Sequence, residues 1–237
     1  YFSNFSSKYG IINGQATPGE STFWNLWLEK DKHYSSLKEI STYSANQLIE
    51  FVGRIERMFN QPFLNKNLRH NHRIGLLAEL FPQALFIVIL RNPKDTAFSI
   101  LRGRKETAGS FDKWFSIKPR NFNKLLNQPP EKQVVQQIKG LVEDLGNDLK
   151  LVDEERFIGL YYEDFCNDPK NVISKFKNFF RENGVVLNNK YQLPEYFSYS
   201  HNNSHGLSRK QINEVDKYLL EEGLLDSKLI LPCNFIS

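Results

Sequence analysis

The stretch FIVILRNPKDTAFS, residues 86–99, constrains the fold more than any other part of the chain. The apolar run from 85 to 90 is rich in β-branched residues and predicts a strand buried on both faces, in the middle of a sheet covered by helices on either side. Asn92 is a good N-cap and Pro93 suits the first helical position, so a helix is expected to start at once. Arg91 is the unusual residue, because here a buried strand ends on a charge.

The other predicted strands and helices alternate along the chain, which indicates βαβ units and a parallel sheet. Two more strands are predicted, over 61–67 and 156–162. Helices are predicted from a cap at Ser44 or Asn46 to Pro62, over 73–81, in the region after 130 with a stripe from Val134 to Leu149, over 168–184 and over 210–224. The section from 107 to 130 is predicted to be rich in loops.

Bulk properties exclude several classes of protein. With 237 residues, 40% apolar and 24% charged, the chain is expected to be globular, and we interpret 1–237 as a single domain. A net charge of +4 suits an anionic ligand but not a nucleic-acid arm, and the cluster of Arg102, Arg104 and Lys105 is expected to be a solvated helix end. Cys166 and Cys233 show no metal-ligand spacing and are expected to be reduced thiols.

Two further expectations concern location and the chain start. No apolar run reaches the roughly 18 residues that a membrane span needs, so we expect no transmembrane segment and a soluble protein, with a cytoplasmic location favoured. The chain begins with Tyr1 and not with Met, and its natural beginning is expected to lie upstream.

Polar residues follow each predicted strand: Asn65-Lys66-Asn67, Arg91, and Tyr162-Glu163-Asp164. In a parallel sheet, ligands bind at the carboxyl ends of the strands, where helix N-termini also point and favour phosphate. Arg91 supplies a guanidinium fork, and Ser99 can offer a hydroxyl to the same anion. The alternative, equally favoured by the chemistry alone, is that Arg91 pairs with Glu163 or Asp164 and that Ser99 is an ordinary helix residue.

Spacing favours the phosphate interpretation. Arg-Asn-Pro at the end of an apolar strand, with Ser eight residues after the Arg, resembles the 3′-phosphate motif of the PAPS-dependent sulfotransferase family. LFPQALFIVILRNP is similar to the family's "FPdAkFI" lead into this strand, and LYYEDFCNDPKNVISKFKNFF is similar to its "YEDL..DP....i..F" block. The resemblance implies a three-layer α/β fold, a parallel sheet flanked by helices like that of the P-loop nucleoside-triphosphate hydrolases.

The resemblance also implies roles for individual residues. Arg91 and Ser99 match the residues that hold the 3′-phosphate of the donor, 3′-phosphoadenosine 5′-phosphosulfate (PAPS), and Tyr162 matches an aromatic residue at the adenine. NKNLRHNHRI is similar to the family's "NK" segment, so Lys66 is expected near the sulfonate or the bridging oxygen. The alternatives are a core tyrosine at a strand end and a solvated lysine.

Two departures from the family pattern are clear. The glycine-rich "PRSGTT"-like loop that cradles the 5′-phosphosulfate occurs nowhere in these residues. We expect it, with its strand, to lie upstream of Tyr1, and the chain alone is expected to bind the donor poorly. The C-terminal basic loop is not recognisable either, although HGLSRK offers Arg209 at about the right place.

The base that takes the acceptor proton is the least constrained residue. Cytosolic relatives use a His two residues after the Lys, a position that is Leu68 here, and His70 and His72 flanked by arginines are minor candidates. Other branches use a Glu ahead of an aromatic cluster, which GESTFW resembles, so Glu20 is the candidate base. The alternatives are a helix-capping role for Glu20 and a core role for the aromatic residues Phe23, Trp24 and Trp27.

These expectations combine into a sulfotransferase that moves the sulfonate of PAPS to a hydroxyl or amine of a small-molecule or glycan acceptor and releases PAP, without a metal and without a nucleic-acid partner. Two alternatives stay open. One is a P-loop kinase-like phosphotransferase, which needs an upstream GxxxxGK[ST] motif and a metal-binding acid. The other is a non-catalytic sulfotransferase-like binding module.

Overall fold

The computed structural model describes residues 6–8, 11–13, 24–29, 34–187, 193–199, 204–225 and 235–236, with the three shortest ranges described through their backbone. The chain divides into two compact units, Tyr1–Pro82 and Gln83–Ser237. Each unit is described by itself below.

The first unit combines a small hairpin with helices. Strand β1 (Ser6–Lys8) pairs antiparallel with β2 (Ile11–Asn13). Helix α2 (Thr42–Phe59) buries Ala45, Leu48 and Val52 along one face. The 3₁₀ turns η1 (Leu37–Glu39) and η2 (Leu68–His72) precede α2 and α3 (Ile74–Leu80), respectively.

The second unit is built on a parallel sheet with the order β3-β4-β5. Strand β3 (Phe86–Leu90) pairs in parallel with β4 (Phe157–Tyr161), from Phe86 opposite Phe157 to Leu90 opposite Tyr161. The short β5 (Phe235–Ile236) pairs in parallel with β4. The predicted parallel sheet is therefore confirmed.

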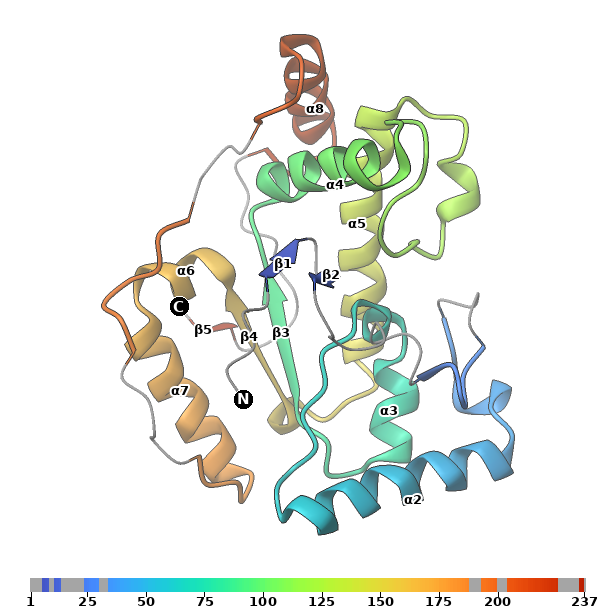
Figure 1. Cartoon of the computed structure of the whole chain (residues 1–237), viewed down its shortest axis with the longest axis vertical. Coiled ribbons are helices and arrows are strands. Elements are labelled where there is room, and N and C mark those ends of the chain that lie inside the picture. Colours follow the sequence, from blue (N-terminus) through green and yellow to red (C-terminus); the bar gives the residue numbers. More distant parts are fainter. Residues whose placement is uncertain are drawn as a thin grey trace. The chain divides into compact units, whose positions relative to one another are not determined.

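Helices connect and cover these strands (Figure 1). They are α4 (Pro93–Ala108), α5 (Pro130–Leu149), α6 (Tyr162–Asn167), α7 (Pro169–Glu182) and α8 (Arg209–Glu221), with the 3₁₀ turns η3 (Phe122–Lys124) and η4 (Glu154–Arg156) between α4 and β4. Ile158 and Leu160 of β4 pack against Val172, Phe176 and Phe179 of α7. Figure 1 shows α4, α5 and α8 together on one side of β3, with α6 and α7 beyond β4. An α/β unit with a parallel sheet and flanking helices is the result.

Two predictions about the first unit are wrong. Residues 61–67 form no strand. The Phe63 N–H donates to the Glu56 carboxylate (2.9 Å), and Asn67 acts as the N-cap of η2. The backbone of Phe63 and the side chain of Asn67 are thus used in other contacts than those of a sheet. Helix α2 is capped by Ser41, whose side chain accepts the Ser44 N–H, and not by Ser44 or Asn46. It ends before Pro62, where Asn60 adopts a left-handed conformation (φ 48°).

The prediction that β3 is buried on both faces is also wrong. Residues paired across parallel strands share a face, so Ile87 and Ile89 lie on the same side of the sheet as Ile158 and Leu160. Helix α7 packs on the β4 part of this face, whereas Ile87 and Ile89 are 37% and 62% exposed. Only Val88 and Leu90, on the opposite face, are buried.

Arg104 contradicts the prediction of a solvated helix end, because its side chain is fully buried. Its guanidinium donates to Gln133 Oε1 (2.6 Å) and lies 4.9 Å from the ring of Trp114. Gln137, also buried, donates to the carbonyls of Phe115 and Ile117. Burial lowers the pKa of Arg104 to about 10, so it stays charged at neutral pH and ties the 109–128 connection to α4 and α5.

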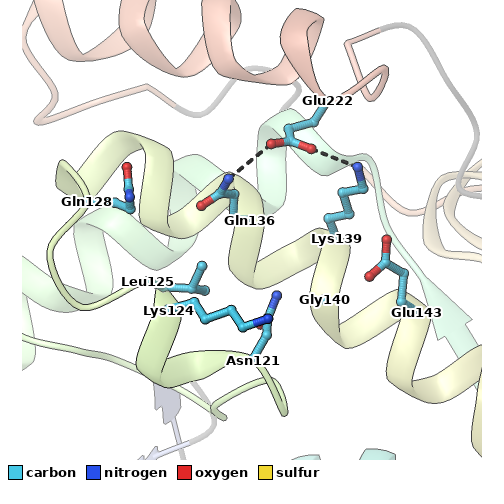
Figure 2. A pocket seen from close by; sticks show the side chains of 9 residues that line it. All are labelled: Asn121, Lys124, Leu125, Gln128, Gln136, Lys139, Gly140, Glu143 and Glu222. Carbon is cyan, nitrogen blue, oxygen red and sulfur yellow. Dashed lines mark hydrogen bonds and ion pairs between the residues drawn. The ribbon is translucent and has the colours of Figure 1, made fainter.

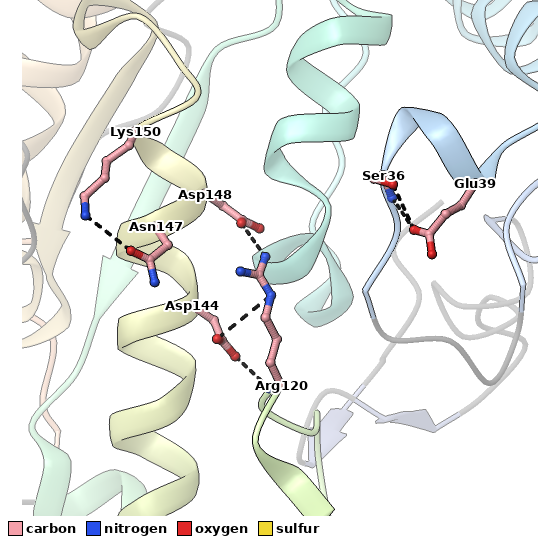
Figure 3. Close-up of polar contacts among 7 residues, drawn as sticks. All are labelled: Ser36, Glu39, Arg120, Asp144, Asn147, Asp148 and Lys150. Carbon is pink, nitrogen blue, oxygen red and sulfur yellow. Dashed lines mark hydrogen bonds and ion pairs between the residues drawn. The ribbon is translucent and has the colours of Figure 1, made fainter.

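A second polar clamp fixes the next part of this connection (Figure 3). The backbone N–H of Arg120 donates to Asp144 Oδ2 (2.8 Å), and its guanidinium forms an ion pair with Asp148, both on α5. Since both carboxylates are buried, the arginine compensates charge that would otherwise be costly to bury.

None of the described helices combines the length and apolar sequence that crossing a bilayer requires.

Candidate anion-binding site

Side-chain hydrogen bonds hold the turn from β3 into α4. Asn92 is the N-cap of α4, and its side chain accepts the N–H groups of Lys94 (2.9 Å) and Asp95 (3.2 Å). Glu163, in the first turn of α6, accepts the N–H of Asn92 (2.9 Å) and so locks this turn to the neighbouring strand end. The cap and Pro93 are confirmed, and the positive end of the α4 dipole is held at the carboxyl edge of the sheet.

Arg91 lies at this edge, and no described residue is its polar partner. In the described part of the chain its guanidinium makes no hydrogen bond or ion pair, and its Nε is buried without an acceptor. The alternative in which Arg91 pairs with Glu163 or Asp164 is not observed among the described residues, and Glu163 instead accepts the N–H of Asn92. A buried guanidinium nitrogen with no acceptor is costly unless an anion arrives to satisfy it.

Tyr162 lies next to Arg91, as the sequence predicts for residues that follow paired strands. The Arg91 guanidinium carbon is 5.1 Å from the centre of the Tyr162 ring. The pKa of the Tyr162 phenol is raised, first by its hydrogen bond with the Cys166 side chain and then by burial. Tyr162 is therefore a neutral aromatic group that can stack on a base.

Cys166 is a buried free thiol, as predicted, whereas Cys233 lies outside the described residues.

Tyr199 is a residue of this site that the sequence did not reveal. Its ring meets that of Tyr162 edge to face at 6.0 Å, and Phe197 two residues earlier stacks on Phe165 of α6 at 5.4 Å. The Phe197 N–H also donates to the Cys166 carbonyl (2.7 Å). No regular periodicity marks residues 193–199, so only the fold could bring this aromatic side chain to Tyr162.

Ser99 and Arg209 occupy well-defined places in their helices. Ser99 is half-buried on α4, two helical turns after Asn92 and hence on the same face as the N-cap. Arg209 is exposed at the first position of α8, which Ser208 caps. Lys94, in the first turn of α4, forms an ion pair with Asp216 of α8 (2.7 Å), which joins these two helices. The phosphate roles of Ser99 and Arg209 stay predictions.

The remaining predicted residues belong to the first unit or to undescribed positions. Glu20 and Phe23 lie outside the described residues. Lys66 is exposed in the irregular segment before η2. Its role, like that of Glu20, stays a prediction.

Two of the aromatic residues considered for the acceptor side are described. Trp24 is 2% exposed and donates its indole N–H to Asn65 Oδ1 (3.1 Å), whereas Trp27 is half-buried against Phe51 at 5.1 Å. His72 and Arg73, each 1% exposed, lie at the end of η2 and at the N-cap of α3.

A separate pocket of about 340 Å³ lies between η3, α5 and the C-terminal end of α8 (Figure 2). Glu222 accepts from Lys139 (2.7 Å) and Gln136 (3.1 Å) across it. None of the residues predicted for the donor or the acceptor lines this pocket. The Lys139–Glu222 ion pair thus uses one positive charge of this pocket within the protein.

The second unit thus has a parallel sheet in which Arg91 lies at a capped strand-to-helix turn, with the aromatic rings of Tyr162 and Tyr199 beside it. Within the described residues, no group of three or more His, Cys, Asp or Glu side chains could share a metal ion.

Comparison with known proteins identifies the family. A profile of the sulfotransferase family matches residues 9–182, well over half of the chain, so the chain belongs to this family. Two curated relatives, the omega-hydroxy-beta-dihydromenaquinone-9 sulfotransferases Stf3 of Mycobacterium bovis and Mycobacterium tuberculosis, are each 30% identical over 128 residues. The match covers 54% of this chain and 31% of each relative, so the chain spans about a third of the length of these proteins. No solved structure matches.

Proposed function

We propose that the protein transfers the sulfonate group of PAPS to an acceptor and releases PAP. The observation that carries the proposal is Arg91, in a chain of the sulfotransferase family. Its Nε is buried at the capped N-terminus of α4 and has no acceptor among the described residues. A phosphate at this position would satisfy the guanidinium and meet the positive end of the helix dipole.

The proposed donor site uses the carboxyl edge of the sheet. Arg91 and Ser99 hold the 3′-phosphate, Tyr162 stacks on the adenine, and Arg209 contributes charge from the start of α8. The β3-β4-β5 sheet then forms part of a three-layer fold like that of the P-loop nucleoside-triphosphate hydrolases, and 1–237 acts as a single sulfotransferase domain. The parallel strands β3 and β4, each followed directly by a helix, support this arrangement, as does the Asn92 cap of α4.

The proposed chemistry is an in-line displacement at sulfur. The donor supplies an activated sulfonate whose bond to the bridging oxygen breaks, and the electron pair stays with the phosphate of PAP. Lys66 neutralises the charge that develops on this oxygen. Glu20 takes the proton of the acceptor as its oxygen or nitrogen bonds to sulfur. No metal ion takes part in this proposal.

For the acceptor we favour a hydroxyl group. The two mycobacterial relatives carry an omega-hydroxy compound in their names, and sulfonate transfer needs a nucleophilic oxygen or nitrogen on the acceptor. A lipid-like small molecule with a terminal hydroxyl is therefore the first acceptor to test, followed by amines and glycans.

The test is sulfonate transfer from ³⁴S-labelled PAPS to a panel of hydroxyl, amine and glycan acceptors, followed by mass spectrometry on the full-length protein. We expect a labelled product with at least one hydroxyl acceptor, and a loss of about 100-fold in kcat/KM for PAPS in Arg91→Ala. Arg181→Ala, an exposed arginine on α7, is the matched control and should leave transfer unchanged.

The alternatives give different results in the same assay. Binding of PAP without transfer to any acceptor would favour a non-catalytic binding module. Phosphate transfer from ATP that depends on Mg²⁺, without sulfonate transfer, would favour the kinase-like phosphotransferase.

A further inference from the structure

Lys66 lies in a segment whose two neighbouring residues are both held by side-chain hydrogen bonds. Asn65 Oδ1 accepts from the indole Nε1 of Trp24 (3.1 Å) and lies 2.9 Å from Nε2 of His70. Asn67, on the other side, accepts the Arg69 N–H (2.9 Å) as the N-cap of η2. Lys66 itself is exposed. The backbone of an exposed lysine is therefore fixed from both sides, in an otherwise irregular segment.

The hydrogen-bond donors of this arrangement can be assigned from chemistry. An indole nitrogen only donates, so the Asn65 atom facing Trp24 is the amide oxygen. The same oxygen faces Nε2 of His70, and because an amide oxygen only accepts, Nε2 carries the proton. Nδ1 of His70 is then unprotonated, and it is buried without a hydrogen-bond partner among the described residues.

His70 is poorly suited to be the catalytic base in this state. Nε2 is used as a donor, and a proton on Nδ1 would be a buried N–H without an acceptor. In agreement, burial and then the nearby charge of Arg73 lower the pKa of His70 to about 3. His70 is thus a neutral donor at physiological pH.

The anchor of the arrangement is a buried side chain. Trp24 is 2% exposed, and its ring meets the His70 ring edge to face at 4.6 Å. Its carbonyl accepts the Leu28 N–H (2.8 Å), which closes the turn that begins at Trp24. Asn65 is therefore bound to groups that are themselves held in the core of the first unit.

We propose that Trp24, Asn65 and His70 form a positioning triad that sets the place of Lys66. The proposal rests on the sulfotransferase function, in which Lys66 approaches the bridging oxygen. It assigns His70 a role through Asn65 and not in proton transfer. A lysine on an unrestrained loop would have to be ordered in each catalytic cycle, and small displacements of a catalytic group cost large factors in rate.

The kinetic test compares His70→Leu with His70→Gln in the full-length protein, since the Gln side-chain amide can donate from about the place of Nε2. We expect His70→Leu to lower kcat by about 10- to 100-fold with PAP affinity unchanged by calorimetry, and His70→Gln to recover kcat to within about threefold of wild type. An inactive His70→Gln would make His70 a base and overturn the proposal. So would wild-type kcat in a folded His70→Leu.

A double-mutant cycle tests whether His70 acts through Lys66. In a Lys66→Ala background, His70→Leu should cost less than about threefold in kcat, because the positioned group is already gone. Full additivity of the two losses would overturn the proposal.

A readout without activity separates this proposal from the sulfotransferase assignment. Nitrogen NMR of ¹⁵N-histidine-labelled protein should show His70 protonated at Nε2 between pH 5 and pH 8 at about 25 °C, and Asn65→Leu should abolish that preference. Protonation at Nδ1 in the wild type would overturn the triad. Absence of sulfonate transfer with the Nε2 tautomer intact would overturn the function and leave the triad in place.

Discussion

At the scale of single residues, the two proposals depend on the surroundings of Arg91 and His70. Among the described residues, one buried nitrogen of Arg91 has no acceptor and one buried nitrogen of His70 has no donor, as is also true of other buried side chains such as Arg73. An anion could accept from the first nitrogen, which supports the proposed donor site. The second is tolerated because an imidazole nitrogen without a proton leaves only an acceptor unsatisfied. The same kind of observation thus supports a binding role in one proposal and a positioning role in the other.

His70 also predicts how stability depends on pH. Its pKa is lowered to about 3 in the folded protein, so between pH ~6.5 and ~3 the unfolded chain binds a proton that the folded chain does not. The free energy of unfolding should therefore fall as the pH is lowered through this range, by at most about 1.4 kcal/mol per pH unit from His70. Above pH ~6.5 the His70 contribution should not change with pH. Denaturant titrations of wild type and His70→Gln at several pH values measure the difference, and parallel curves for the two proteins would contradict it.

At the scale of elements, two glycines allow the 109–128 connection to pack closely against helices α4 and α5. A Cβ added at Gly103 of α4 would lie 2.3 Å from the Phe115 ring, and one at Gly140 of α5 would lie 2.9 Å from Pro119. These glycines allow the connection to lie directly on both helices, where Arg104 and Arg120 hold it through buried polar groups.

Gly103→Ala should destabilise the second unit by about 2 kcal/mol, because the Phe115 ring must move out of a packed site. Gly53→Ala in α2 is the control: its Cβ would meet only the flexible end of Arg57, at 3.2 Å, so helix propensity should stabilise this variant by about 0.5 to 1 kcal/mol. Chemical denaturation measures both. An unaffected Gly103→Ala protein would show that the close packing of α4 on Phe115 is wrong.

The sequence predicts best those helices whose ends are marked by capping residues, proline or glycine. Asn92-Pro93 and Asp168-Pro169 begin α4 and α7 as expected, and Gly184 with φ 76° follows the end of α7. The stretch 61–67 was predicted wrongly, because local sequence cannot show whether a strand has a neighbour to pair with. Burial was predicted less well than helices, as the exposed Ile89 and the buried Arg104 show, since burial depends on which distant elements cover a residue.

At the scale of the whole molecule, the sequence predicts only those site residues that directly follow a recognisable strand. The sequence places Arg91 and Tyr162 at the carboxyl ends of two predicted strands. Because these strands pair in the structure, the Arg91 guanidinium carbon lies 5.1 Å from the centre of the Tyr162 ring. Tyr199 comes from an irregular segment, and its place beside Tyr162 depends on the packing of Phe197 on α6. The division of the chain into two compact units was not predicted either, because no linker-like composition marks the region around Pro82.

The most direct measurement of the central claim is the affinity of the full-length protein for PAP relative to 5′-AMP, which lacks the 3′-phosphate, in wild type and Arg91→Ala. If Arg91 holds the 3′-phosphate, calorimetry should show that wild type prefers PAP by about 100-fold, and that Arg91→Ala removes most of this preference while its affinity for 5′-AMP is unchanged. Equal affinities for the two nucleotides in wild type, or a preference for PAP that survives in Arg91→Ala, would contradict the account.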